Sequence, residues 1–257
     1  MIRTAAVIAA VALTLAGCVA KENASDQRGG SDFSPASTEP SSDSAEPSAE
    51  PSASGGGAAT SGDCKFKADQ SGKQPAVGLP PDEGPATATT LTLTTSAGAI
   101  AIKLDAAKAP CTVQSMVFLA SKGFFNNTVC HRLTTSAALK VLQCGDPEGT
   151  GTGGPGYVVP DELPKDLPAA PAGNGTVIYQ RGVAAMANAG PGTTGSQFFL
   201  VYGDSTLTPD YNVFGTIDTT GLATLDQIAA GGVTPGQNGA EDGAPTTPVT
   251  ITSATAA

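Results

Sequence analysis

The segment Met186–Leu200, MANAGPGTTGSQFFL, joins a polar run rich in glycine to two adjacent phenylalanines. Glycine, proline and asparagine are typical of turns, whereas Phe198 and Phe199 are typical of a strand. Neighbouring side chains on a strand point to opposite faces. The segment therefore predicts a loop that leads into a strand, with the two phenylalanines on opposite faces of that strand.

Alternation of apolar and polar residues on both sides of this segment predicts a mainly β domain. Residues 89–105 alternate Leu and Ile with Thr, Ala and Lys across a Gly turn, which is a hairpin pattern. The 32 glycines and 20 prolines favour short strands joined by many turns. Further strands are predicted at 128–133, 140–144, 176–185, 197–202, 213–217 and 247–254, and helices at 110–123 and 221–232. This order predicts a closed antiparallel barrel with helices over its ends.

The first 18 residues have the pattern of an export signal. Arg3 precedes an apolar run at 5–15, which is too short to span a bilayer, and Leu-Ala-Gly-Cys follows at 15–18. This ending resembles the lipobox of bacterial lipoproteins, which implies that residues 1–17 are a signal peptide and that Cys18 carries acyl chains such as palmitate. Such chains anchor a protein without a transmembrane helix. The alternative is an ordinary signal peptide or membrane anchor with an incidental Cys.

Residues 18–63 are predicted to form a flexible tether. They repeat Ala-Glu-Pro-Ser, continue with Gly and Ala, and almost lack the large apolar side chains that a folded core needs. Residues 19–63 carry a net charge of −6 and residues 64–257 carry −5, and Arg3 completes the total of −10. This acidic balance, without clusters of Lys and Arg, argues against nucleic acid as a partner.

Four cysteines, Cys64, Cys111, Cys130 and Cys144, follow the tether. In an exported protein they permit two disulfides, in three connectivities that the sequence does not distinguish. The chain has one histidine and no Cys-x-x-Cys motif, so no metal site is expected.

Four segments resemble the motifs of one known family. They are CHRL at 130–133, VLQCGDPEGTGTGGPGY at 141–157, AAMANAGPGTTGSQFFL at 184–200 and YNVFG at 211–215. In this order they are similar to the cyclophilins, which are peptidyl-prolyl cis-trans isomerases, over residues 89–252. The resemblance implies a closed eight-stranded antiparallel barrel capped by two helices, and an activity on X-Pro bonds that requires no cofactor and no metal.

The resemblance and the N-terminal signals together imply how the whole chain is organised. Residues 88–257 are expected to form the isomerase domain, and residues 64–87 an N-terminal extension of it. The expected role is rotation of X-Pro bonds in exported, unfolded or flexible polypeptides, which assists their folding. The protein is expected to be a monomer that is anchored to the cell membrane through Cys18, with its domain outside the cytoplasm.

Position by position, the resemblance implies roles for particular side chains. Arg132 matches the family's catalytic arginine, and Gln143 matches its substrate-binding glutamine. Asn188 matches the residue that contacts the substrate backbone. The other substrate-binding positions that the resemblance implies are Gln197, Phe199, Val141, Leu207, Tyr211 and Phe214, and it leaves Phe198 for the barrel core.

The sequence departs from the family pattern between Arg132 and Gln143. Ten residues separate them, where the family has Val-Ile-Pro-Gly-Phe-Met-x, and Lys140 and Val141 stand at the phenylalanine and methionine positions. One wall of the pocket is therefore expected to be thinner and more polar. A non-catalytic module of the cell envelope that binds proline-containing segments is the alternative function.

Strand alternation also bears on the disulfides. If Arg132 and Gln143 both face the substrate, Cys130 shares the face of Arg132, whereas Cys144 faces inward. A direct Cys130–Cys144 bond is then disfavoured unless a bulge intervenes. The hypothesis that follows is a bond between Cys130 and Cys111, with the other two cysteines paired.

Overall fold

The computed structural model describes residues 64–69, 77–81 and 87–257. The expected signal peptide at 1–17 and the tether at 18–63, with its acylated Cys18, lie outside these residues. Within the described part of the chain, no helix is long and apolar enough to cross a membrane.

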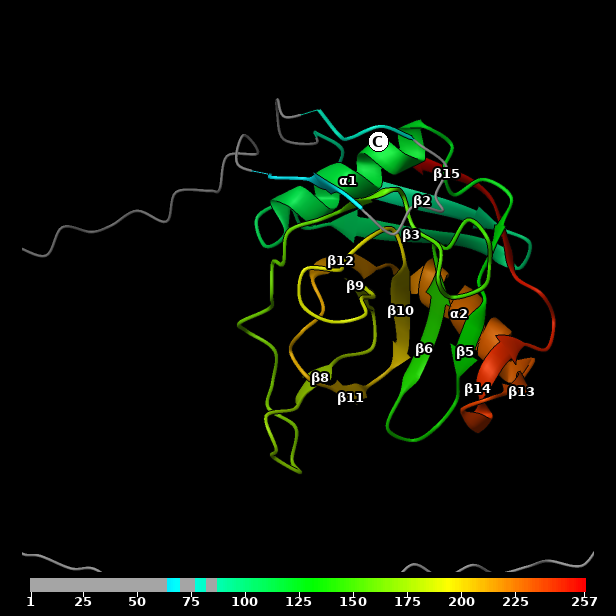
Figure 1. Cartoon of the computed structure of the whole chain (residues 1–257). Helices are drawn as coiled ribbons and strands as arrows, with labels where there is room; N and C mark the ends of the chain where they lie inside the picture. Colours follow the sequence, from blue (N-terminus) through cyan, green and yellow to red (C-terminus); the bar gives the residue numbers. More distant parts are fainter. Residues whose placement is uncertain (1–63, 70–76, 82–86) are drawn as a thin grey trace, which may run out of the picture. The chain divides into compact units, whose positions relative to one another are not determined.

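One antiparallel sheet of eleven strands makes up most of the fold (Figure 1). Its strands are β2 (Thr90–Thr95), β3 (Gly98–Leu104), β4 (Thr128–Val129), β5 (Arg132–Thr134), β6 (Lys140–Cys144), β9 (Val183–Met186), β10 (Phe198–Gly203), β12 (Val213–Ile217), β13 (Val233–Gly236), β14 (Gly239–Pro245) and β15 (Thr250–Ala256). Their order across the sheet is β13-β14-β5-β6-β10-β9-β12-β3-β2-β15-β4. Two further ladders pair β1 (Lys67–Ala68) with β7 (Tyr157–Val158), and β8 (Val177–Tyr179) with β11 (Ser205–Leu207).

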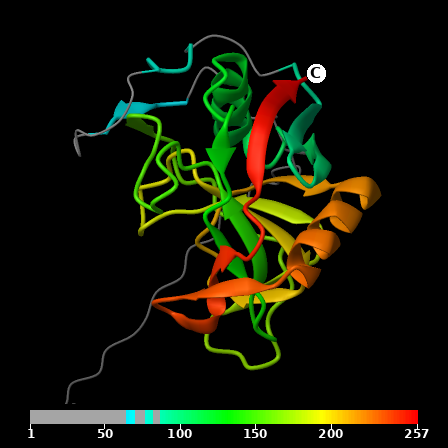
Figure 2. The ribbon, with the colours of Figure 1, turned by 90° about the vertical axis from the view of Figure 1, so that its right-hand side faces the viewer.

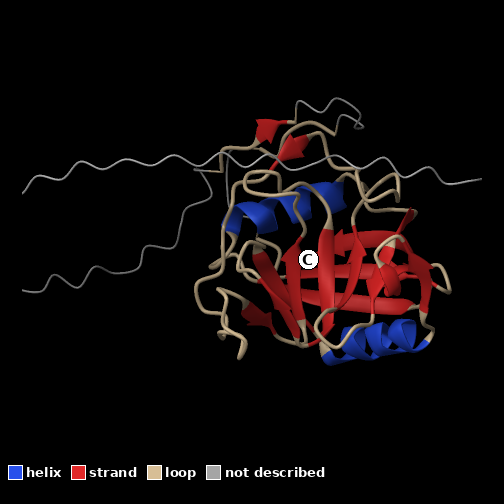
Figure 3. Ribbon diagram, turned by 60° about the horizontal axis from the view of Figure 1, so that its bottom comes forward, coloured by secondary structure: helices blue, strands red, loops and turns tan. Residues whose placement is uncertain are grey.

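Two helices, α1 (Pro110–Ser121) and α2 (Thr219–Ala230), lie on opposite sides of the curled sheet (Figure 3). Pro110 suits the first turn of α1 because an N–H at that position would have no partner within the helix. Asp218 caps α2 by accepting a hydrogen bond from the Gly221 N–H at 2.6 Å. Strand β15 runs beside α1 (Figure 2). The predicted mainly β fold with two covering helices is confirmed.

The β2–β3 hairpin has the register that its alternation predicts. Leu91 pairs with Ile102 and Leu93 pairs with Ile100, and all four side chains are buried. Gly98, the first residue of β3 after the turn, has a φ of 138°, a conformation that strains other residues. The alternating apolar side chains thus form one wall of the main core.

The sheet is open, which corrects the prediction of a closed eight-stranded barrel. Among the described strands, β13 and β4 end the hydrogen-bonded order. The predicted strand 128–133 is divided at Cys130 and His131, so that β4 pairs with β15 whereas β5 pairs with β6 and β14. Because the two halves bond to different neighbours, no continuous ladder crosses the division. The β13–β14 hairpin is absent from the sequence prediction because its Pro235 and several glycines are atypical of strands.

The two disulfides are Cys64–Cys111 and Cys130–Cys144, which corrects the pairing expected from strand alternation. The Cα atoms of Cys130 and Cys144 lie 4.0 Å apart, and both side chains are buried in the main core. The alternation argument fails because Cys130 lies in the break between β4 and β5. The alternation within β5 therefore does not extend back to this cysteine.

Two buried clusters lie on opposite faces of β10. Phe198 is fully buried in the main core, where its ring contacts Phe125 and Phe214. Phe199 belongs to a smaller cluster, which we call the second cluster. The buried members of the second cluster are Val141, Tyr179, Ala185, Phe199 and Val201. The two adjacent phenylalanines thus divide between two faces, as alternation predicts.

Candidate active site

A series of side-chain hydrogen bonds crosses the sheet from Asp242 in β14 to the loop before β7. Asp242 accepts hydrogen bonds from Nε of Arg132 at 2.7 Å and from Nη2 at 2.8 Å. Nη1 of Arg132 donates to Oε1 of Gln143 at 3.1 Å. Nε2 of Gln143 then donates to Oε1 of Gln197, and Nε2 of Gln197 to the carbonyl oxygen of Gly153, both at 2.9 Å. We call this connection the hydrogen-bond series.

Strand register explains why these side chains meet. Arg132 is directly opposite Gln143 in the β5–β6 ladder, and Gln143 is directly opposite Phe199 in the β6–β10 ladder. Residues that are directly opposite project from the same face of a sheet. Gln197 lies two residues before Phe199 and so projects from that face as well. Arg132, Gln143 and Phe199 thus place a guanidinium, an amide and an aromatic ring side by side across β5, β6 and β10. We call these three side chains the row.

Arg132 is held as a fixed positive charge by its partners. Its side chain is 33% exposed and that of Asp242 is 19% exposed. Their hydrogen bond raises the pKa of Arg132 and lowers the pKa of Asp242, and in each case it outweighs the opposing effect of burial. Asn238 also donates to Asp242, at 3.3 Å. At neutral pH Arg132 and Asp242 are therefore both charged, and two parallel hydrogen bonds join them.

The second cluster provides an apolar surface next to this row. The Phe199 ring meets the rings of Tyr179 and Tyr211 edge-on, with centroids 6.0 and 5.5 Å away. Other apolar residues pack against the cluster from its rim, among them Leu139, Leu207 and Val213. The structure thus brings Phe199 together with Val141, Leu207 and Tyr211 from the set that the sequence predicts.

Phe214 does not lie with this set, which corrects the sequence prediction. It is fully buried in the main core, and its ring centroid is 6.2 Å from that of Phe198. Alternation along β12 turns its neighbour Val213 toward the second cluster instead. Alternation along β12 therefore indicates Val213, in place of Phe214, as the residue that faces the second cluster.

The wall at β6 also differs from the expectation. The side chain of Lys140 lies against Gly203, whereas Val141 is buried in the second cluster. Leu139 projects on the same side as Val141 and packs against that cluster. Leu139 and Val141 therefore make this part of the wall apolar, and Lys140 is not part of it.

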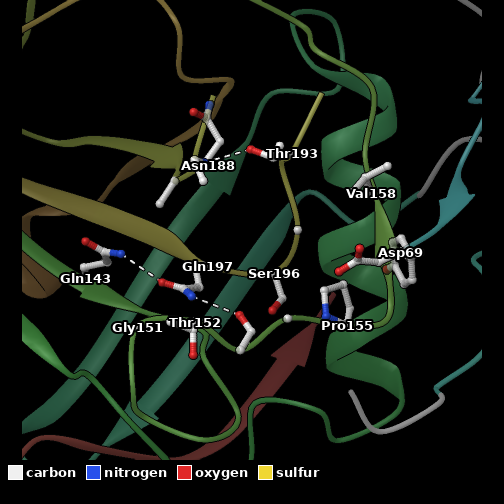
Figure 4. Close-up of a pocket in the computed structure, with 16 residues that line it drawn as sticks. Asp69, Gln143, Gly151, Thr152, Pro155, Val158, Asn188, Thr193, Ser196 and Gln197 are labelled. Carbon is white, nitrogen blue, oxygen red and sulfur yellow. Dashed lines mark hydrogen bonds between the residues drawn. The ribbon is translucent and has the colours of Figure 1, made fainter. Parts of the chain in front are cut away.

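A pocket of about 330 Å³ adjoins the row beside Gln197 (Figure 4). Gln143, Gln197 and Asn188 all line it. Asn188 also fixes its own loop, because its Nδ2 donates to the carbonyl of Asp210 at 2.8 Å and its Oδ1 accepts from the Gly190 N–H at 3.1 Å. The structure thus brings the three predicted amide side chains to one pocket.

Asp146, which the sequence analysis does not single out, organises the loop that forms one wall of this pocket. Its buried carboxylate accepts hydrogen bonds from the N–H groups of Glu148, Thr150, Gly151 and Gly153, at 2.8, 3.0, 2.6 and 3.1 Å. Burial acts to raise the pKa of Asp146, but these backbone hydrogen bonds outweigh it and lower the pKa. A Cβ at Gly153 would overlap the carboxylate. An Asp followed by glycines is typical of many loops, so the sequence carries only a weak signal for this arrangement.

The mainly β fold and its two helices are features that the resemblance to cyclophilins implies. The family described as "Cyclophilin type peptidyl-prolyl cis-trans isomerase/CLD" matches residues 90–256. The chain therefore belongs to the cyclophilin-type peptidyl-prolyl cis-trans isomerase family.

Similar proteins carry names of the same kind. A "Probable peptidyl-prolyl cis-trans isomerase B" of Mycobacterium leprae is 53% identical over 189 residues, which cover 73% of this chain and 62% of that protein. The protein of the same name in Mycobacterium tuberculosis strain H37Rv is 57% identical over 165 residues, covering 63% and 53%. A Helicobacter pylori peptidyl-prolyl cis-trans isomerase is 38% identical over 144 residues, covering 55% and 81%. The matched region thus spans between 53% and 62% of the length of these mycobacterial relatives.

A solved structure supports the fold. The crystal structure of a cyclophilin type peptidyl-prolyl cis-trans isomerase from Cryptosporidium parvum matches with a TM-score of 0.52. The match covers 66% of this chain and 98% of that one, at 24% sequence identity. At this identity the similarity concerns the fold alone.

Substitution of Asp146 by alanine is expected to lower the free energy of unfolding by about 2 kcal/mol, because the loop loses four hydrogen bonds to a buried carboxylate, among them that of the buried Gly153 N–H. Urea unfolding at neutral pH measures this change. Since the folded pKa of Asp146 is lowered, its contribution is present above the unfolded pKa of about 3.9 and is lost as the pH falls through the folded pKa. Glu148→Gln, at an exposed carboxylate in the same loop, is the matched control. Equal stability of the two variants would contradict the role given to Asp146.

Proposed function

We propose that the chain catalyses the cis–trans isomerisation of peptide bonds that precede proline. The observation that carries this proposal is the row of Arg132, Gln143 and Phe199, in which a fixed guanidinium lies beside an apolar cluster. Family membership and the names of the relatives support the same activity.

The reaction requires stabilisation of a twisted amide. Rotation about an X-Pro bond faces a barrier of about 18–20 kcal/mol because the amide loses its resonance. No covalent bond breaks, so the reaction needs no nucleophile, metal or redox cofactor. As the bond twists, the prolyl nitrogen regains a lone pair, which accepts a hydrogen bond only in that state. A fixed donor beside this nitrogen therefore lowers the energy of the transition state relative to both planar states.

Arg132 is the donor in this proposal. Asp242 binds its Nε and Nη2, and Gln143 binds its Nη1. Because a guanidinium carries more N–H groups than these contacts use, Arg132 retains donors for a substrate. Its charge is permanent and its orientation is set before substrate binds, which is the condition for electrostatic stabilisation without reorganisation.

The second cluster would hold the proline ring while the preceding residue rotates. Phe199, which is 5% exposed, and Tyr211 offer aromatic faces and edges, and Leu207 and Val141 complete the apolar surface. Gln143 and the loop of Asn188 would bind the neighbouring peptide groups. Because the proline ring would be held in place, only the residue that precedes it would have to rotate about the X-Pro bond.

Substitution of Arg132 by alanine is expected to lower kcat by about 100-fold or more, because the transition state loses its donor. The rate is measured by NMR exchange on a short proline peptide. Arg181→Ala is the matched control, since Arg181 also pairs with a carboxylate, that of Asp226, but on the exposed surface away from the row. A wild-type rate no faster than that of Arg132→Ala would contradict the enzyme proposal and favour the non-catalytic binding module.

Substitution of Asp242 by asparagine is expected to lower kcat by about tenfold, equivalent to about 1.4 kcal/mol, with a smaller change in KM. The amide has one acceptor oxygen where the carboxylate has two, so it cannot form both parallel hydrogen bonds with the guanidinium, and Arg132 loses its fixed orientation. A shifted ¹⁵N resonance of Arg132 Nε–H would report this change independently of the rate. The control is Glu241→Gln, which removes the adjacent exposed carboxylate. An unchanged kcat would remove Asp242 from the mechanism.

We further propose that the domain acts on exported polypeptides outside the cytoplasm, tethered through acylated Cys18. The support is the Leu-Ala-Gly-Cys sequence at 15–18 and the presence of two disulfides, which form in oxidising compartments. In a bacterial host, an alkyne analogue of palmitate should label the wild-type chain but not Cys18→Ala. Labelling of both, or of neither, would contradict the lipid anchor.

A further inference from the structure

Tyr179, the last residue of β8, lies in the second cluster but outside the four sequence segments that carry the family resemblance. Its ring meets those of Phe199 and Tyr211 edge-on, with centroids 6.0 and 6.1 Å away. The rings of Phe199 and Tyr211 also meet each other, at 5.5 Å. The three rings are thus in mutual contact, and Tyr179 is the member that is fully buried.

The hydroxyl of Tyr179 binds the connection between β11 and β12, residues 208–212. Its one O–H is shared between the carbonyl oxygens of Thr208 and Tyr211, each 3.3 Å away, and its oxygen accepts from the Tyr211 N–H at 3.3 Å. The hydrogen bonds that the described residues make to the Tyr211 backbone all involve this hydroxyl. Burial raises the pKa of Tyr179, so the hydroxyl keeps its proton at neutral pH.

Other groups hold the two neighbours of Tyr211. Nδ2 of Asn188 donates to the carbonyl of Asp210 at 2.8 Å, and the carbonyl of Asn212 accepts a backbone hydrogen bond from β9 at 2.9 Å. These contacts fix the chain on either side but do not reach the Tyr211 N–H and carbonyl. The orientation of those two groups, and with them that of the Tyr211 ring, therefore depends on the Tyr179 hydroxyl.

We infer that Tyr179 is a positioning residue of the proline site, whose hydroxyl fixes Tyr211 so that the Tyr211 ring stands against Phe199 before a substrate binds. The inference rests on the proposed function and adds to it a buried residue that touches no substrate. Tyr211 would form one side of the apolar surface on which the proline ring lies. A surface that is already ordered binds more tightly, because binding then does not have to order it.

The first test is Tyr179→Phe, which removes the hydroxyl and keeps the ring. Loss of these hydrogen bonds is expected to raise KM and the peptide Kd by about fivefold and to change kcat by less than about twofold. The reason is that an apolar surface serves the planar and the twisted amide alike, whereas Arg132 serves the twisted one. NMR exchange on a proline peptide gives kcat and KM, and chemical-shift titration gives Kd. Wild-type KM and Kd would overturn the inference.

Tyr202→Phe is the matched control. Tyr202 is also a buried tyrosine whose O–H donates to a backbone carbonyl, that of Thr134, but it belongs to the main core. Urea unfolding should show a loss of stability in both variants, whereas Tyr179→Phe alone should lose affinity for the peptide. Equal loss of affinity in both would overturn the inference, because affinity would then follow stability in general.

A double-mutant cycle tests whether the hydroxyl acts through Tyr211. Tyr211→Ala removes the ring that Tyr179 is inferred to position. Addition of Tyr179→Phe to Tyr211→Ala should therefore weaken peptide binding no further. If the two losses of affinity multiply instead, Tyr179 acts by another route and the inference is overturned.

Hydrogen exchange on the wild-type chain tests the contact without any substitution. The protection factor of the Tyr211 N–H should exceed that of Asp210, an exposed residue of the same connection, by about fivefold or more. Equal protection would overturn the inference even if Tyr179→Phe does not fold. If the wild-type chain accelerates no peptide, the proposed activity fails, and the ratio of Kd between Tyr179→Phe and wild type still decides the positioning role.

Discussion

The hydrogen-bond series from Asp242 through Arg132 to Gly153 is the constraint on which the arrangement of the site depends. A free arginine side chain has many rotamers, and ordering it costs up to about 2 kcal/mol. Here Asp242 and Gln143 hold the guanidinium from two sides, so the side chain loses this conformational entropy when the protein folds and not when a substrate binds. In the proposed mechanism, a substrate therefore meets a donor that is already oriented. The series also joins β14 to the loop before β7 through β5, β6 and Gln197, the residue that precedes β10.

The break between β4 and β5 makes this arrangement possible. At Cys130 and His131 the chain leaves the ladder of β15 and enters that of β6 and β14, which brings Arg132 next to both Gln143 and Asp242. The Cys130–Cys144 disulfide fastens the chain at the same place, one residue from Gln143 and two from Arg132. A covalent link there limits how far β5 and β6 can separate beside the row.

The loop before β7 also links the hydrogen-bond series to the N-terminal extension. Asp146 fixes the backbone of this loop. In the same loop, the carbonyl oxygen of Gly153 accepts a hydrogen bond from Nε2 of Gln197. The residues that follow form β7, on which β1 of the N-terminal extension pairs. The extension thus reaches the edge of the pocket that the amide side chains line, and its Cys64–Cys111 disulfide joins it to α1. A segment outside the family match thereby contributes Asp69 to that pocket.

The sequence by itself determined the features that rest on local pattern. These are the mainly β class, the β2–β3 hairpin, the two helices, the division between Phe198 and Phe199, and the family to which the motifs belong. Only the tertiary structure decided which distant segments meet: the open sheet, both disulfide pairings, the positions of Phe214 and Lys140, and the contacts of Asp242, Asp146 and Asp69. The physical reason is that alternation counts residues along one unbroken strand. It does not locate a break such as that at Cys130, and it carries no information about a partner such as Asp242, which lies 110 residues from Arg132.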